Sequence, residues 1–145
     1  MKPELGRSYP PAWRGVPPHM ARRDVPLWHR WLDLFASRYQ AFFYDVALGA
    51  GTDPGPEQEP EMRAGFIRIS RLRVDALGVQ PDRWTLFEVR PTAGAGALGA
   101  LVTYTALWAV DPPDKRPLHP TLVTDVLRPE LKTLFAAHGI IVVEL

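Results

Sequence analysis

Two strand-like runs joined by a tight turn constrain this fold more than any other feature of the sequence. Apolar and polar residues alternate from residue 66 to 79, and the run WTLFEVR at 84–90 alternates in the same way. A period of two is the pattern of a β-strand with distinct faces. The intervening QPDR suits a turn. We therefore expect an antiparallel hairpin that places Asp75 and Glu88 at comparable distances from its turn.

The segments around this hairpin predict further helices and strands. Apolar residues at helical spacing indicate a helix over about 25–40, with Asp24 at its N-cap. The aromatic-rich run 41–49 predicts a strand, and the Pro/Gly-rich segment 51–65 a long loop. Beyond the hairpin we expect a helix over 93–110, a strand over 121–126, a helix over 128–139 and a strand over 140–145.

This order of elements predicts a fold class. Three strands in succession, followed by alternating helices and strands, indicate an α/β (α+β-like) protein with a mixed β-sheet flanked by helices. The core would be αβββαβ with a C-terminal αβ. We expect a single domain over residues 24–145, preceded by an extended proline-rich arm over 1–23.

Composition excludes several classes of protein. Cysteine is absent, which excludes disulfides, thiolate metal sites and cysteine nucleophiles. No apolar run approaches the ~18 residues of a membrane span. The first residues also lack the apolar region of a signal peptide, so we expect no membrane contact. The 16 prolines and the absence of asparagine fit a thermophilic source, although a GC-rich genome gives a similar bias.

Charge leaves the question of nucleic acid open. The formal net charge of +1 argues neither for nor against such a partner for the whole chain. However, all but three of the 17 cationic residues are arginine, whose planar fork suits phosphate and carboxylate.

The segment 94–99 reads GAGALG and matches the dinucleotide-binding pattern G-x-G-x-x-G. That pattern needs an acidic residue at the end of the next strand, about 20 residues on. The chain has the loop DPPDKRP there, and no G-K-[ST] follows the glycines as a P-loop requires. The preceding run also carries Glu88 and Arg90, whereas a central parallel strand is normally apolar. We therefore interpret these glycines as the start of a helix.

Asp75, Glu88 and Arg90 form the strongest candidate site. Two converging carboxylates can hold Mg²⁺, which activates water and stabilises phosphoryl charge. A cation two residues after the second acid lies on the same strand face and can approach an attacked phosphate. The alternative is an ion-pair network among these three residues that fixes the strand register.

These motifs resemble those of the PD-(D/E)XK nucleases. Val-Asp on the second strand and Glu-x-Arg on the third, within RVDALGVQPDRWTLFEVR, are similar to that superfamily, whose fold is the restriction-endonuclease fold. The following ALGALVTYTALW resembles the branch with Q-x-x-x-Y on the next helix. The resemblance implies metal-binding roles for Asp75 and Glu88, and places Arg90 at the family's lysine and Tyr104 at its tyrosine.

Two positions depart from that pattern. Arg90 replaces a lysine, and arginine stays charged and tends to lock onto carboxylates. Ala100 replaces the glutamine and makes no hydrogen bond. The resemblance therefore implies a degenerate site, with Asp75, Glu88, Arg90 and Tyr104 as its remnant. The family often has a further acid on its first helix, where Asp33 is the candidate.

The whole-chain pattern, with an arm like YPPAWRGVPPHM and a strand like YDVALG, also resembles small phage-encoded proteins. This resemblance implies a virion structural protein, made in the host cytoplasm, such as a head–tail connector or neck component. It would form a homo-oligomeric ring, contact portal or tail proteins and need no cofactor. Arm residues expected at the subunit interface are Tyr9, Trp13, Arg14, Arg22 and Arg23.

Two other functions stay open. The first is an active Mg²⁺-dependent DNA nuclease, in which Asp75 and Glu88 would bind the metal. The second is a non-catalytic module that contacts DNA.

Overall fold

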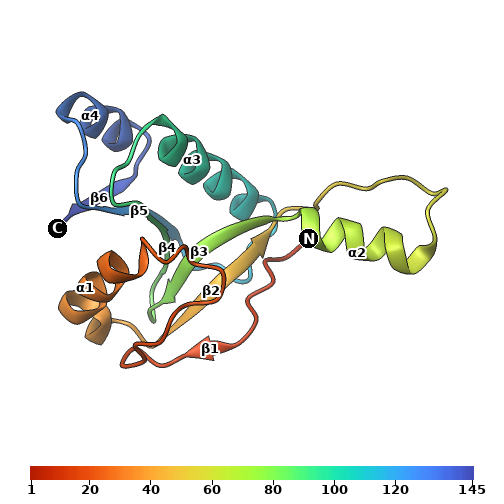
Figure 1. The fold of residues 1–145 in the computed structure, drawn as a ribbon, viewed down its shortest axis with the longest axis horizontal. Coiled ribbons are helices and arrows are strands. Elements are labelled where there is room, and N and C mark those ends of the chain that lie inside the picture. Colours follow the sequence, from red (N-terminus) through yellow and green to blue (C-terminus); the bar gives the residue numbers. More distant parts are fainter.

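The structure, a computed structural model, describes all residues from 1 to 145 and contains one six-stranded mixed sheet with helices on both faces (Figure 1). The strands are β1 (Ser8–Tyr9), β2 (Ala41–Leu48), β3 (Leu72–Val79), β4 (Trp84–Val89), β5 (Leu118–Thr124) and β6 (Ile141–Glu144). The helices are α1 (Val25–Phe35), the 3₁₀ turn η1 (Ala36–Arg38), α2 (Pro60–Ser70), α3 (Ala95–Val110) and α4 (Pro129–Ala137).

The strands lie side by side in the same order as in the chain. Strands β1 to β4 pair antiparallel, whereas β4–β5 and β5–β6 pair parallel. Residues 80–83 form the tight turn, since Val79 pairs with Trp84 on either side of it. Parallel neighbours need a crossover, and α3 and α4 supply the two crossovers. The predicted α/β (α+β-like) mixed sheet, with its αβββαβ core and C-terminal αβ, is confirmed.

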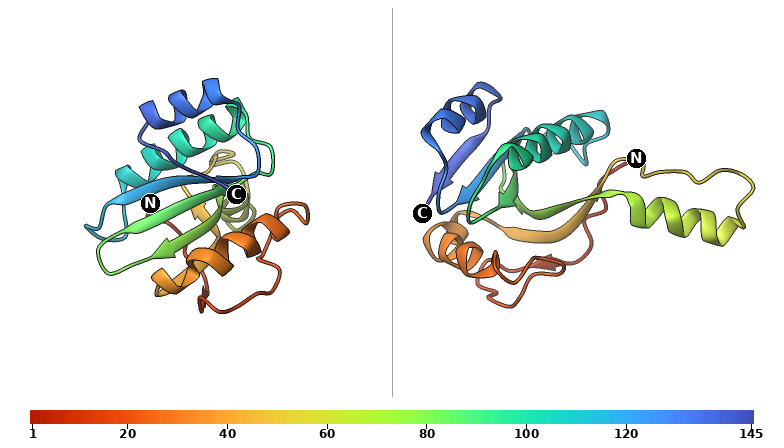
Figure 2. Two further views of the ribbon diagram at one scale, coloured as in Figure 1. Left: turned by 90° about the vertical axis from the view of Figure 1, so that its left-hand side faces the viewer. Right: turned by 45° about the horizontal axis from the view of Figure 1, so that its top comes forward.

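The sheet separates two apolar cores (Figure 2). Helix α1 covers one face, where Trp28 and Trp31 pack edge-on against Phe87, with centroid distances of 5.0 and 4.5 Å. Helices α3 and α4 cover the other face, which buries Leu101 and Phe135. No helix combines the length and the apolar character that crossing a membrane requires.

Helix α2 corrects the prediction for residues 51–71. The sequence suggested a loop to residue 65 and a strand from Phe66, but Pro60–Ser70 are helical and β3 begins only at Leu72. Leu72 pairs with Leu48, the last residue of β2, so residues before it have no neighbouring strand. Without a strand partner, their backbone groups bond within a helix instead. Figure 1 shows α2 projecting from the sheet, and none of its residues is buried.

The arm at 1–23 is part of the domain rather than a separate segment. Its strand β1 pairs with β2, and Met20 is buried in the core under α1. The rings of Tyr9 and Trp13 lie 5.2 and 5.8 Å from the ring of Tyr44. The arm thus makes extensive contacts within its own chain, and its expected role at a subunit interface stays a prediction.

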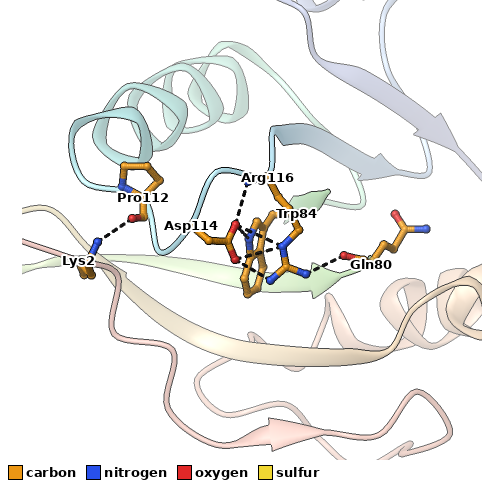
Figure 3. A network of polar contacts seen from close by, with 6 residues as sticks. All are labelled: Lys2, Gln80, Trp84, Pro112, Asp114 and Arg116. Carbon is orange, nitrogen blue, oxygen red and sulfur yellow. Dashed lines mark hydrogen bonds and ion pairs between the residues drawn. The ribbon is translucent and has the colours of Figure 1, made fainter. Parts of the chain in front are cut away.

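A polar network attaches the loop between α3 and β5 to the hairpin turn between β3 and β4 (Figure 3). Asp114 accepts hydrogen bonds from the indole of Trp84 at 3.0 Å and from the guanidinium of Arg116 at 2.6 Å. Arg116 also donates to the carbonyl of Gln80 at 2.9 Å and lies 4.7 Å from the Trp84 ring. Lys2 donates to the Pro112 carbonyl at 2.9 Å and so attaches the same loop to the start of the chain.

Candidate active site

The candidate site is centred where β2 and β3 both lose their regular alternation. Tyr44 pairs with Ala76 and Val46 with Val74, so Asp45 lies opposite Asp75 between these two pairs. Tyr44 and Ala76 face the core under α1, but Val46 and Val74 face the core under α3. Strict alternation would put all four on one face. The chain changes face at Asp45, whose φ is 52°, and at Asp75.

Asp75 is half-buried and joins β3 to β4 beyond their paired residues. The last pair of this ladder is Ala76 with Phe87. Past it, the Asp75 carboxylate accepts a hydrogen bond from the backbone N–H of Val89 at 3.0 Å. The side chain thus takes the place of a main-chain acceptor and brings its charge toward Glu88, the residue before Val89.

Glu88 is the most enclosed acid of the site, with 2% of its surface exposed. Its Oε1 atom lies 3.4 Å from Nε of Arg90, whereas Oε2 accepts no hydrogen bond from an N–H or hydroxyl group. The Glu88 carboxyl group is instead within hydrogen-bonding reach of Asp75. Burial, and secondly the charge of Asp75, raise the pKa of Glu88 to about 8. At neutral pH this side chain therefore retains a proton that it can share with Asp75, unless another cation occupies the position.

Arg90 does not bridge the two acids. It forms an ion pair with Glu88 alone, through Nε, and 44% of its side chain is exposed. It also lines a cavity of about 220 Å³ with Arg23, Asp24, Pro91 and Thr92. In a degenerate site we would expect the Arg90 guanidinium to pair with both Asp75 and Glu88 and so neutralise them. Here it pairs with Glu88 only.

Asp24 is the site residue that sequence reasoning missed. It immediately precedes α1, is 7% exposed and makes no side-chain cap; its Oδ1 atom has no hydrogen-bond partner, and Arg23 Nε lies 3.8 Å away. Burial raises the pKa of Asp24, and the charge of Asp75 raises it further, which places these two acids within electrostatic reach. The predicted candidate Asp33 is instead exposed and pairs with Arg14 at 3.0 Å. In the sequence Asp24 resembles an ordinary helix cap. The structure shows that its side chain makes no cap hydrogen bond and lies near Asp75 instead.

Tyr104 completes the group from the side of α3. Burial raises the pKa of Tyr104 to about 12, and the charges of Glu88 and Asp75 contribute. Its phenol is therefore protonated across the physiological range and can act only as a neutral hydrogen-bonding group. The charges of Asp75, Glu88 and Arg90 all act on Tyr104, so the four predicted site residues are close enough to interact electrostatically.

The acids suit a divalent cation that keeps most of its water ligands better than one coordinated entirely by protein side chains. The only two buried side-chain oxygens or nitrogens of the chain without a hydrogen-bond partner are Glu88 Oε2 and Asp24 Oδ1. No three His, Asp or Glu side chains, however, are placed to hold one metal ion. Mg²⁺ is commonly held by one or two carboxylates and keeps several waters, which this arrangement allows. Asp75 and Glu88 would be its ligands.

The interface candidates have different environments. Tyr9 and Trp13 pack on β2, and Arg14 pairs with Asp33 and donates to the carbonyl of Pro11. Arg22 and Arg23 are exposed, and Arg23 approaches Asp24 at 3.8 Å.

Comparison with known proteins gives a limited likeness. No family model matches the chain, and no curated protein matches it. Among solved structures it is similar to a repair endonuclease from Pyrococcus abyssi, with a TM-score of 0.44 and 21% sequence identity. The matched region covers 50% of this chain and 32% of that chain, so it spans about a third of the larger protein. A likeness of this size says nothing about activity, and the functional argument rests on the acids themselves.

Proposed function

We propose that this protein is a Mg²⁺-dependent DNA nuclease whose metal is held by Asp75 and Glu88. The observation that carries this proposal is the close pair of carboxyl groups on Asp75 and the buried Glu88, whose only ion-pair partner is the half-exposed Arg90. Burying an unpaired carboxylate is costly unless a proton or a cation compensates its charge. A divalent cation would compensate it and would also supply an activated water and charge stabilisation for phosphoryl transfer.

The surrounding residues support this chemistry. Arg90 keeps 44% of its side chain exposed, so its guanidinium can contact a phosphate without leaving Glu88. Tyr104, held neutral by its raised pKa, can orient a water or a phosphate oxygen by a hydrogen bond. Asp24 lies at the edge of the site and adds negative charge that favours a cation.

The test is DNA cleavage with Mg²⁺ or Mn²⁺, and with EDTA as the negative control. We expect cleavage by the wild-type chain and none by Asp75→Asn or Glu88→Gln. Asp33→Asn is the matched control, because it removes an exposed carboxylate outside the site. Binding is read independently as a rise in thermal unfolding temperature with Mn²⁺, which Glu88→Gln should abolish. No cleavage and no Mn²⁺ stabilisation in the wild type would refute the proposal.

A second candidate is a non-catalytic virion component, such as a head–tail connector, that forms a homo-oligomer and contacts portal or tail proteins. The Arg90–Glu88 ion pair and the raised pKa of Glu88 favour it, because both let the acids coexist without a metal. Molar mass from light scattering and co-purification with portal or tail proteins test this candidate. A monomer that captures neither would exclude it.

A further inference from the structure

Two cavities adjoin between the N-terminal arm and the strands that carry Asp45 and Arg73. A cavity of about 330 Å³ contains Asp75 in its wall, and a neighbouring cavity of about 290 Å³ extends to Arg7 and Tyr9. The residues that line both are Pro18, His19, Asp45 and Arg73. We call these two adjoining cavities, which extend from Asp75 to Arg7 and Tyr9, the arm groove. One of its walls is the N-terminal arm, and the other consists of β2 and β3.

The junction of the two cavities is built from strained residues. His19 and Asp45 are the only non-glycine residues of the chain with positive φ, at 60° and 52°. Their side chains approach each other, with His19 Nε2 at 3.5 Å from the Asp45 carboxylate. Such backbone conformations cost on the order of 1–3 kcal/mol each and are concentrated at functional sites. Here they bring the His19 imidazole and the Asp45 carboxylate together where the two cavities adjoin.

Asp45 contacts both His19 and Arg73 and leaves some of their N–H groups free. Its carboxylate lies 3.6 Å from Arg73 as well as 3.5 Å from His19, and its carbonyl accepts from Arg73 at 3.4 Å. His19 is nevertheless 79% exposed and Arg73 39% exposed, so both keep N–H groups free for a ligand. The groove has two further acids: Glu4 pairs with the buried Arg71 at 3.4 Å, and Asp75 accepts a hydrogen bond from the backbone N–H of Val89 at 3.0 Å. With its acids partnered in this way, the groove presents the exposed donors of His19 and Arg73 to an anionic ligand.

The far end of the groove has a surface for a flat group. The guanidinium of Arg7 lies over the ring of Tyr9, 4.8 Å from its centroid. Tyr9 is supported from below by Trp13 at 4.5 Å and Tyr44 at 5.2 Å. Because Arg7 covers one face of the Tyr9 ring, the flat surface offered to an unstacked nucleic-acid base is the guanidinium plane of Arg7, which Tyr9 supports.

We propose that the arm groove binds a single strand of DNA and leads it to the acid site. His19 and Arg73 would hold a backbone phosphate, and Arg7, supported by Tyr9, would stack on a base. A single strand fits this arrangement better than a duplex, because a base can reach this surface only if it is unstacked from its neighbours. The inference rests on the proposed function for the identity of the ligand, but it concerns binding and not cleavage.

The experiment measures binding of a fluorescent oligothymidylate of roughly 12 nucleotides in EDTA, in a Glu88→Gln background that cannot cleave. We expect His19→Ala with Arg73→Gln to weaken binding about tenfold, since two charge-assisted contacts are lost. Arg128→Gln is the matched control, because it removes an exposed arginine near α4 and should change affinity less than about twofold. A duplex of equal length should bind more weakly than the single strand.

Arg7→Ala tests the Arg7 end of the groove independently and keeps the inference testable if the double variant does not fold. We expect it to weaken binding about threefold or more. Unchanged affinity in folded groove variants, or tighter binding of the duplex than of the single strand, would refute the proposal that the arm groove binds single-stranded DNA. Absence of cleavage by the wild type, with groove-dependent binding intact, would overturn the proposed nuclease alone.

Discussion

Two of the three acid–x–arginine triplets in the chain behave in opposite ways. Asp114-Lys115-Arg116 lies in the loop before β5, and Glu88-Val89-Arg90 lies at the end of β4. Asp114 accepts bonds from Trp84, from the Arg116 backbone and from its guanidinium, so its pKa is lowered (Figure 3). Glu88 has one weak contact with its arginine and a pKa raised to about 8.

The difference shows that spacing alone does not determine the chemistry of an acid and a base. The first triplet is in a loop near solvent, where the arginine can fold back on the acid and satisfy it. The second is in a strand, where the acid points into the protein and the arginine remains half outside. A satisfied pair stabilises the fold, whereas an unsatisfied buried acid is the kind of group that binds a proton or a cation.

The largest expected difference between the triplets is in cleavage. Asp75→Asn should lower the DNA cleavage rate by about 10²-fold or more, because it removes a charge that stabilises the transition state. Asp114→Asn should leave the rate within about twofold, since that acid is outside the site. Cleavage rates with Mg²⁺, measured with both variants folded by circular dichroism, make the comparison. Equal losses in the two variants would contradict it.

The next difference is in the pH dependence of stability. Folded Glu88 keeps its proton up to a pH of about 8, whereas the unfolded chain loses it near its ordinary value of 4.5. Between these values the folded state binds more protons, so the free energy of unfolding falls as pH rises, by up to about 1.4 kcal/mol per pH unit. Glu88→Gln removes this term. Urea unfolding in EDTA should therefore show that the stability of the variant relative to the wild type increases with pH up to a pH of about 8.

Asp114 should give the opposite sign. Its lowered pKa means that its contribution to stability is present above its ordinary value of 3.8 and is lost as pH falls below it. Asp114→Asn should cost about 1 kcal/mol at neutral pH, which is modest because the ion pair is partly solvated. Urea unfolding at neutral pH and in acid checks this. A difference from wild type that persists in strong acid would show that packing, and not charge, is responsible.

The smallest expected effect is that of Arg90→Lys. The side chain is half exposed and touches Glu88 only at 3.4 Å, so stability should change by less than about 1 kcal/mol. Because lysine can also contact a phosphate and orient water, cleavage should be retained or increased. Parallel measurements of unfolding and cleavage test both parts. A large loss of cleavage would show that the planar fork of arginine is required.

The hairpin and the later α/β alternation could be predicted from sequence because they depend on local periodicity. The convergence of Asp75 with Glu88 followed from the turn at 80–83 and strand alternation. Helix α2 could not be predicted in this way, because its helical state depends on β2 ending at Leu48. Asp24 was missed for a related reason: its burial beside Asp75 depends on where α1 lies against the sheet.

The arm groove illustrates the same limit. The left-handed backbone at His19 and Asp45 leaves only a weak mark in residue type: Asp and His tolerate this region better than most residues, but neither marks it as glycine does. Their contact joins residues 26 positions apart and arises only when the arm packs along the sheet. Sequence periodicity predicts what a strand presents on each face, but not which distant loop crosses that face.

Helix α2 has a consequence for how this protein opens. An isolated helix of 11 residues has little stability of its own, and α2 gains none from burial. Its attachment is limited to contacts such as Arg63 with Asp53 and Ser70 with Thr52. Amide hydrogens of α2 should therefore exchange through a local opening that leaves the sheet closed. A protease should cut this segment first, and the two pieces should stay together through the pairing of β2 with β3, with Asp24, Asp75 and Glu88 still in place.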